Sequence, residues 1–224
     1  MYDFVEDKEF LKRAQNFCSK FMKKLEEELR EKDINTQFFL VGSGARNMVT
    51  QNANEPIDFD YNLNIISVNG SNDIDDWQEK EIKHSVIVAA NKIMKSFSLP
   101  DVDDSTSSIT TKSMYYKDEK DIEFSIDICM VTIVNNKWYR LIHEKGINSH
   151  YDKYYWNEAP HSHHYQRKSY AIKSVPGWWE KVRKEYLNIK NRYLEHNDYD
   201  HPSFVCYIEA VNNIYNQMKQ LKLI

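Results

Sequence analysis

The chain has 224 residues, enough to bury a full hydrophobic core, and we treat it as two closely packed parts. Hydrophobic residues make up 41% of it and aromatic residues 13%, which excludes an intrinsically disordered chain. No apolar run approaches the roughly twenty residues that span a bilayer, so we expect no membrane association and a cytoplasmic location. The cysteines, Cys18, Cys129 and Cys206, stand far apart in apolar segments, which predicts core thiols rather than disulfides or a cysteine metal site.

Charge is distributed unevenly along the sequence, although the net charge is only -4. Residues 101–127 contain eight acidic residues, whereas residues 165–192 contain eight Lys or Arg and only two glutamates. The acidic segment suits metal cations and the basic segment suits phosphates, with solvated surface charge as the alternative for both. The acidic balance of the whole chain gives no case for duplex DNA as a partner.

The first third of the chain predicts a helix, a strand and a glycine-rich turn. Apolar residues at every third or fourth position favour an amphipathic helix over residues 7–33. A short apolar strand follows and breaks into a turn formed by Gly42, Ser43 and Gly44, after which residues 45–51 favour a short helix. Residues 57–66 then alternate between apolar and polar, which predicts a strand with one face in the core.

Helices and a hairpin are predicted for the remainder. A second long helix is expected over residues 77–97, before Pro100. Two strand-like runs, at residues 108–117 and 121–134, flank a turn at 118–120 and predict a hairpin. After residue 139 we expect an aromatic loop and then mainly helices, two of which are predicted over residues 177–197 and 202–221.

Three aspartates carry the strongest chemical signal. Asp58 and Asp60 lie one residue apart in a strand, so their side chains share a face and repel each other unless a cation lies between them. Asp127 is a charge inside an otherwise apolar strand and would complete such a site. Oxygen ligands favour Mg²⁺ or Mn²⁺, and two such ions can hold both oxygens of a phosphoryl displacement. Glycines in the 42–44 turn would let backbone N–H groups approach a phosphate.

This order of elements and motifs resembles the DNA polymerase beta-type nucleotidyltransferase superfamily. The match consists of Val41-Gly42-Ser43, then Asp58 and Asp60, then Asp127, and it covers roughly residues 1–135. The resemblance implies an α+β fold, with a mixed sheet flanked by helices. It places a catalytic core over residues 1–138 and a mainly helical part, packed on that core, over residues 139–224.

The same resemblance implies roles for the motif residues. Gly42, Ser43 and Gly44 would hold a nucleoside triphosphate, with ATP favoured by analogy only, and the three aspartates would bind Mg²⁺ or Mn²⁺. The implied reaction moves a nucleoside monophosphate to a hydroxyl acceptor, a small molecule, nucleotide or RNA, and releases pyrophosphate. The Gly-Ser form and the long preceding helix are most similar to the oligoadenylate synthetase-like and bacterial cyclic-oligonucleotide-synthesising branches. The alternative is a catalytically silent nucleotide-binding or antitoxin-like module with the same fold.

Other residues have two interpretations each. Lys181 and Lys184 lie one helical turn apart on the face away from the apolar stripe, so they either contact the triphosphate or face solvent. The histidines at 161, 163 and 164 fit a transition-metal site or a polar loop. The aromatic residues at 151 and 154–156 fit base stacking or packing between the two parts.

Overall fold

The computed structural model of the chain describes residues 1–115, 123–159, 163–198 and 201–224. Internal contacts divide the chain into two compact units. The sheet unit contains Glu6–Asn47 and Asn54–Pro160, and the helical unit contains Met1–Val5, Met48–Ala53 and His161–Ile224.

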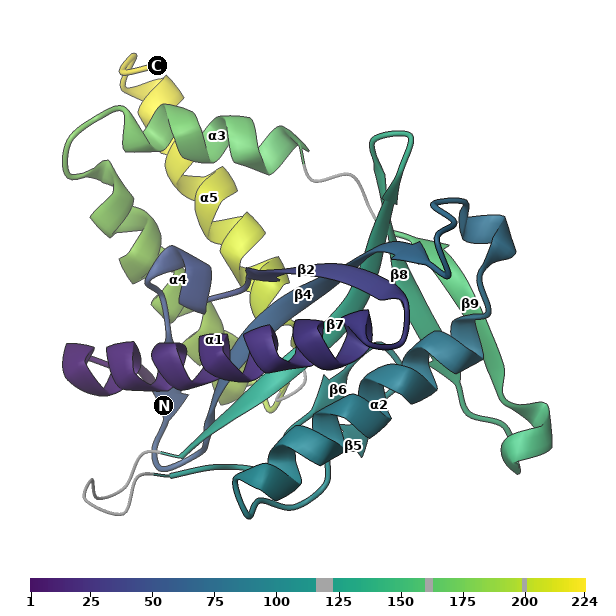
Figure 1. Cartoon of the computed structure of the whole chain (residues 1–224). Helices are drawn as coiled ribbons and strands as arrows, with labels where there is room; N and C mark the ends of the chain where they lie inside the picture. The colour runs from purple at the N-terminus through teal and green to yellow at the C-terminus, as the bar shows by residue number, and fades with distance from the viewer. Residues whose placement is uncertain (116–122, 160–162, 199–200) are drawn as a thin grey trace. The chain divides into compact units, whose positions relative to one another are not determined.

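A mixed sheet of seven strands forms the centre of the sheet unit (Figure 1). Five strands lie in the order β2-β4-β7-β6-β5, and β8 and β9 extend the sheet from β7. β4 and β7 run parallel, whereas the other neighbours are antiparallel. The strands are β2 (Ile34–Leu40), β4 (Ile57–Val68), β5 (Asp103–Asp104), β6 (Ile109–Thr110), β7 (Phe124–Val134), β8 (Lys137–Glu144) and β9 (Lys153–Glu158).

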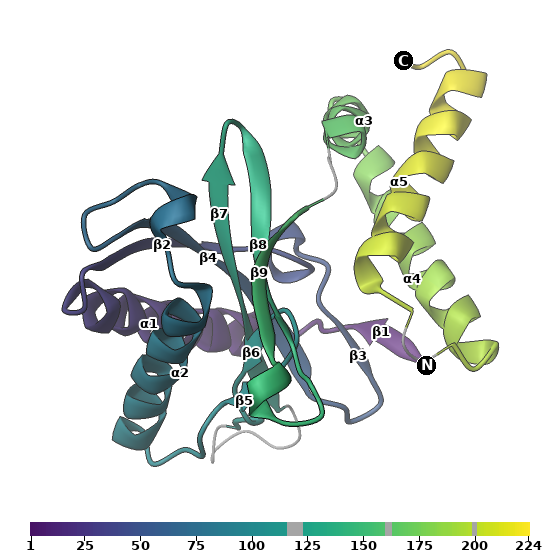
Figure 2. The same ribbon diagram turned by 90° about the vertical axis from the view of Figure 1, so that its right-hand side faces the viewer.

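Two long helices, α1 (Lys8–Arg30) and α2 (Glu79–Ser96), lie on the same side of this sheet (Figure 2). α1 begins where the side chain of Asp7 accepts a hydrogen bond from the Phe10 N–H, at 2.9 Å, which satisfies a free donor of the first turn. The ring of Phe124 in β7 contacts the rings of Phe10 and Phe17 edge to face. We call the covered side the helix face. Its core residues include Phe59, Tyr61, Leu63, Ile126 and Ile128, all buried.

The helical unit has three helices and a two-stranded sheet (Figure 2). The helices are α3 (His163–Lys173), α4 (Trp178–Glu195) and α5 (Ser203–Gln220), and β1 (Tyr2–Phe4) pairs with β3 (Thr50–Asn52). α5 packs against the other two helices, and the shared core contains Ile172, Val182, Tyr186 and Val211. The amide of Asn191 in α4 holds β1 by bonding both backbone groups of Tyr2.

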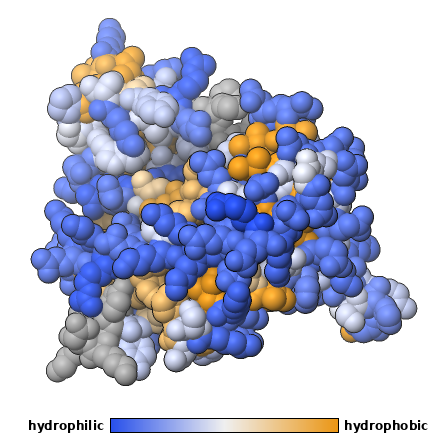
Figure 3. Space-filling model, in the orientation of Figure 1, coloured by the Kyte–Doolittle hydropathy of each residue, from blue (hydrophilic) through white to orange (hydrophobic). Residues whose placement is uncertain are grey.

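The surface shown in Figure 3 is mostly hydrophilic, with small hydrophobic groups between polar side chains. Among the residues that the structure describes, no helix is both long enough and apolar enough to cross a membrane. Cys18 and Cys206 are buried free thiols, as predicted, and Cys129 is partly buried and also unpaired with another cysteine.

The four long helices and the mixed α+β sheet are confirmed. The prediction that residues after 139 are loop and helix is wrong for residues 139–158, because β8 and β9 form there. In β8 only Leu141 and His143 are buried, so the alternation is short, and aromatic residues lie on both faces of β9. The predicted domain boundary after residue 138 stays a prediction.

Two smaller segments also differ from expectation. The helix predicted over residues 45–51 is one 3-10 turn, η1 (Gly44–Arg46), followed by β3, because Asn47 adopts a left-handed conformation that ends the turn. Within the described residues 108–115, the predicted hairpin strand is reduced to the two residues of β6, with an isolated bridge from Met114 to Phe124. The predicted turn at 118–120 lies outside the described residues.

Candidate functional site

The three aspartates lie on the face of the sheet opposite the helix face, which we call the aspartate face. Asp60 in β4 and Asp127 in β7 are register partners in the parallel pair, and Asp58 is the partner of Ser125. Register partners on adjacent strands lie about 4.8 Å apart at the backbone, with side chains on the same side. The pairing of β4 with β7 therefore brings Asp127 beside two carboxylates that are 67 and 69 residues away in sequence.

Hydroxyl groups hold two of these carboxylates. Thr110 Oγ1 in β6 donates a hydrogen bond to Asp127 Oδ1 at 2.5 Å, and the Ser125 hydroxyl donates to Asp58 Oδ1. Burial raises the pKa of Asp127, the Thr110 bond opposes this, and the charge of Asp58 raises the pKa further. The sheet thus holds Asp127 where its ionised form is disfavoured. A neighbouring cation would favour the ionised form instead.

The Gly42 backbone lies directly against the Asp60 carboxylate. A Cβ atom built on Gly42 would lie 2.0 Å from Asp60 Oδ2, and Gly42 has a φ of +62°. Both the space and the conformation therefore require glycine. The Val41 N–H also donates to the Asp60 carbonyl at 2.8 Å, which ties the start of the turn to β4. Gly42 and the strand β4 that carries Asp60 are thus parts of one site.

The remainder of the turn is short and well ordered by its own contacts. Ser43 begins η1 but its side chain makes no capping hydrogen bond. Gly44 is buried, and a Cβ on it would lie 3.3 Å from both Leu40 and Phe59, so its role includes close packing. The Arg46 guanidinium donates to the Gly42 carbonyl and closes the turn.

The fit of a divalent cation rests on the donor set. Carboxylate oxygens from β4 and β7 share one face, and they are the ligands that Mg²⁺ and Mn²⁺ prefer. Among the described residues, however, no three His, Cys, Asp or Glu side chains are grouped closely enough to hold a metal ion. Asp58 and Asp127 are instead turned to hydroxyl groups. The donor types and the strand register suit a cation, whereas the side chains as they lie do not form a metal site.

The predicted basic residues lie in the helical unit. Lys181 Nζ lies 3.5 Å from the centre of the Trp178 ring, and both Lys181 and Lys184 are exposed on α4. A cation over an aromatic face is a favourable contact within the helix surface itself. Their predicted contact with a triphosphate stays a prediction.

Two other predicted features have different outcomes. The aromatic residues near 154 pack within the sheet unit: Tyr154 stacks on His143 at 4.2 Å, and Trp156 contacts Trp77 edge to face. Of the histidines, position 161 and the side chains of 163 and 164 lie outside the described part of the chain.

Sequence reasoning missed three residues of the aspartate face. Thr110 and Ser125 hold carboxylates, and Arg140 in β8 is the register partner of Val131, four residues beyond Asp127 on the same face. Burial raises the pKa of the Cys129 thiol, and the charge of Arg140 is the strongest opposing influence, so the guanidinium lies close to this face. The alternation of residues 137–144 was the signal that could have placed Arg140.

Comparison with known proteins identifies the fold. No protein-family model matches the sequence, and no curated protein is significantly similar to it. The structure of Vibrio cholerae DncV with bound GTP superposes with a TM-score of 0.55 at 13% identity, over 94% of this chain and 52% of that one. The Elizabethkingia meningoseptica cyclic dinucleotide synthase CdnE, with GTP and Apcpp, gives 0.52 at 14% identity, over 91% of this chain and 69% of that one.

The chain has the polymerase-beta-type nucleotidyltransferase fold. Of these neighbours, CdnE is a cyclic dinucleotide synthase, and the fold that the sequence resemblance implied is confirmed. DncV with bound 3'-deoxy ATP is also similar, with a TM-score of 0.52 at 12% identity over 94% of this chain. The chain spans about half the length of the DncV structures it matches, 52% in both cases.

Proposed function

We propose that the chain is a metal-dependent nucleotidyltransferase that moves a nucleoside monophosphate from an NTP to a hydroxyl acceptor. The observation that carries this proposal is the register pairing of Asp60 with Asp127, directly beside the Gly42 backbone. A nucleotide-binding fold supports it, because the similar structures contain GTP, Apcpp or 3'-deoxy ATP.

Each site residue has a role in this proposal. Asp58, Asp60 and Asp127 hold Mg²⁺ or Mn²⁺, which when bound neutralises phosphate charge and polarises the reacting phosphoryl group. Backbone amides of Ser43 and Gly44 contact the phosphates, since Gly42 leaves space for them beside Asp60. Catalysis then consists of positioning and charge neutralisation.

The proton of the acceptor hydroxyl passes to Asp127. The acceptor oxygen forms a bond to the α-phosphorus, the bond from this phosphorus to the bridging oxygen breaks, and pyrophosphate leaves. Asp127 lies beside the cation ligand Asp60 on the adjacent strand, and a carboxylate within hydrogen-bond reach of a hydroxyl can accept its proton.

The nucleotide and the acceptor are open choices within the proposal. The similar structures include both GTP and adenosine compounds, so neither base is preferred. The acceptor is a small molecule, a nucleotide or RNA. Lys181 and Lys184 are proposed to bind the triphosphate as charge partners, in a salt-sensitive way.

The alternative, a silent nucleotide-binding module, is favoured by one observation. Asp58 and Asp127 are bonded to hydroxyls, and within the described residues no group of acidic or other ligating side chains stands ready for a metal ion. Such a protein would bind nucleotides without turnover. The two functions differ in a single readout, the release of pyrophosphate.

Incubation with each α-phosphate-labelled NTP and Mg²⁺ or Mn²⁺ tests the proposal. Transferred label is resolved on small molecules, RNA and protein. Asp60→Asn should abolish transfer, whereas Asp101→Asn is the matched control, because Asp101 is an exposed aspartate that pairs with Lys95 outside the site. NTP binding without pyrophosphate release from any nucleotide or acceptor would favour the silent module.

A further inference from the structure

The β5–β6 hairpin, residues 103–110, has short strands and, among the described residues, pairs with the rest of the sheet only along β7. Each of its strands has two residues, and β6 contacts β7 through the pairs Ile109 with Ile128 and Thr110 with Asp127. Isolated hairpins are marginal even when longer. Yet this hairpin carries Thr110, whose hydroxyl bonds the Asp127 carboxylate.

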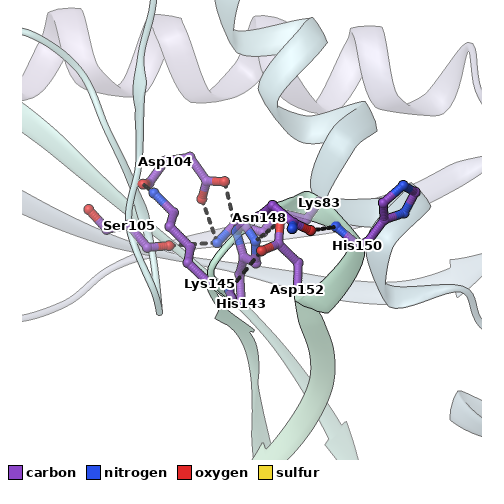
Figure 4. A network of polar contacts seen from close by, with 9 residues as sticks. Lys83, Asp104, Ser105, His143, Lys145, Asn148, His150 and Asp152 are labelled. Atoms are coloured by element: carbon purple, nitrogen blue, oxygen red, sulfur yellow. Dashed lines mark hydrogen bonds and ion pairs between the residues drawn. The ribbon is translucent and has the colours of Figure 1, made fainter.

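A buried ion-pair network holds the hairpin from the other side (Figure 4). Lys83 of α2 is 1% exposed, and its Nζ donates to the Ser105 carbonyl at 2.6 Å and lies 2.7 Å from Asp104 Oδ1. Burial lowers the pKa of Lys83, and the hydrogen bond and charge of Asp104 oppose this. Lys83 therefore depends on the hairpin for its partners, and the hairpin depends on Lys83.

His143 of β8 is a further member of the network, in which Lys145 Nζ also donates to the Asp104 carbonyl at 2.5 Å. We call Lys83, Asp104 and His143 the clamp. His143 Nδ1 lies 2.8 Å from Asp104 Oδ2. The backbone N–H of His143 donates to the Thr106 carbonyl at 2.7 Å. The ring is fixed from outside, since Nε2 lies 3.2 Å from Asp152 Oδ2 and Tyr154 stacks on the ring.

The two faces of the hairpin connect the clamp to the aspartate face. Asp104 is the register partner of Ile109, which is fully buried on the helix face beside Ile128. Thr110 is the next residue along the strand, so its side chain points to the aspartate face. A movement of β5 on one face must therefore move the Thr110 hydroxyl on the other.

We propose that the clamp positions Asp127 through the β5–β6 hairpin and the Thr110 hydroxyl, so that Lys83, Asp104 and His143 are positioning residues for the candidate site. The inference rests on the proposed function because that proposal supplies the cation. The contacts of the clamp do not depend on whether the protein turns over a substrate. None of the three clamp side chains contacts the reacting groups.

A double-mutant cycle with Mn²⁺ as the probe tests this proposal. Thr110→Val should weaken Mn²⁺ binding about tenfold, as expected for one lost hydrogen bond to a charged group, and Thr110→Ser should restore it. Lys83→Met should weaken binding in the wild-type background and add nothing in the Thr110→Val background. Lys92→Met, at an exposed ion pair with Glu28, is the matched control and should change nothing.

The outcomes separate the proposal from its alternatives. Additive effects of Lys83→Met and Thr110→Val, or no effect of Lys83→Met, would overturn it. If Lys83→Met does not fold, His143→Phe replaces it, because Lys83 and Asp104 keep each other as charge partners and an aromatic ring still stacks on Tyr154. If the wild type binds no Mn²⁺, the proposed metal site fails. Exchange of backbone amide hydrogens then still tests whether the clamp holds the hairpin. Loss of the clamp should then speed exchange of the Thr111 N–H, bonded to Ile126, but not of the Val41 N–H, bonded to Asp60. The same exchange rate at Thr111 in the wild type and in the clamp variant would contradict the proposal.

Discussion

The two faces of the sheet carry two groups of charged residues, like charges on one face and paired opposite charges on the other. On the aspartate face, Asp58, Asp60 and Asp127 place like charges on adjacent strands, and two of them accept hydrogen bonds from hydroxyls. On the helix face, Lys83, Asp104 and His143 place opposite charges in contact, with Lys83 and His143 almost wholly buried. Both groups meet at the β5–β6 hairpin.

The difference shows what each group does for the protein. A buried lysine paired with a carboxylate and a carbonyl holds structure, because removal of either partner leaves a desolvated charge. Like carboxylates on one face oppose folding until a cation arrives, since Asp58 disfavours the ionised form of Asp127. We therefore expect substitutions on the two faces to have opposite effects on stability.

The largest effect is expected for Lys83→Met. The change leaves Asp104 with only His143 as its buried partner, so the free energy of unfolding should fall by about 3–5 kcal/mol. Urea denaturation measures this. Lys92→Met should cause a much smaller loss, since Lys92 is exposed. Equal losses for the two variants would mean that the clamp is not structural.

Gly42→Ala should have the next largest effect. The left-handed conformation alone costs an alanine about 1–2 kcal/mol, and the new Cβ also collides with Asp60. Gly70→Ala is the matched control, because Gly70 has a φ of +81° but nothing within 4 Å of its Cβ position. Thermal unfolding should rank Gly42→Ala below Gly70→Ala. The same stability for both would place Asp60 away from the turn.

Ser125→Ala should cost about 1 kcal/mol, as the hydroxyl that bonds Asp58 is removed from a buried position. Chemical denaturation with and without Mn²⁺ gives the comparison. We expect the loss to grow in the presence of Mn²⁺, because Ser125 holds Asp58 for the cation as Thr110 holds Asp127. A loss that shrinks with Mn²⁺ would show that the cation replaces the hydroxyl.

The smallest effect, and one of opposite sign, is expected for Asp127→Asn. The pKa of Asp127 is raised above its ordinary 3.8 by burial and by Asp58, while Thr110 opposes the shift. A raised folded-state pKa means that the protonated carboxyl contributes to stability. This contribution is fully present below pH 3.8 and is lost as the pH rises through the folded-state pKa. Relative to Asp127→Asn, the metal-free wild type should therefore lose stability as pH rises. Thermal unfolding from acid to neutral pH measures this, and a wild type that gains stability would contradict it.

The sequence predicted which face the aspartates share better than it predicted the residues that support them. Period-two alternation in residues 57–66 placed Asp58 and Asp60 on one face, and the apolar run around Asp127 marked it as exceptional. The pairing of β4 with β7 is a long-range contact, so no local pattern could place Thr110 or Ser125 against these carboxylates. The clamp was invisible for the same reason, because Lys83 looks like any polar position of an amphipathic helix until Asp104 is placed beside it.

One binding measurement tests most directly whether the aspartate face and the Gly42 turn form a single site for a cation and an NTP. Isothermal titration with ATP and with GTP is done with and without Mn²⁺, on the wild type and on Asp60→Asn. The account predicts that the wild type binds at least one of these nucleotides, that this binding requires the cation, and that Asp60→Asn abolishes it. Equal affinity without Mn²⁺, or unchanged affinity in Asp60→Asn, would contradict the account.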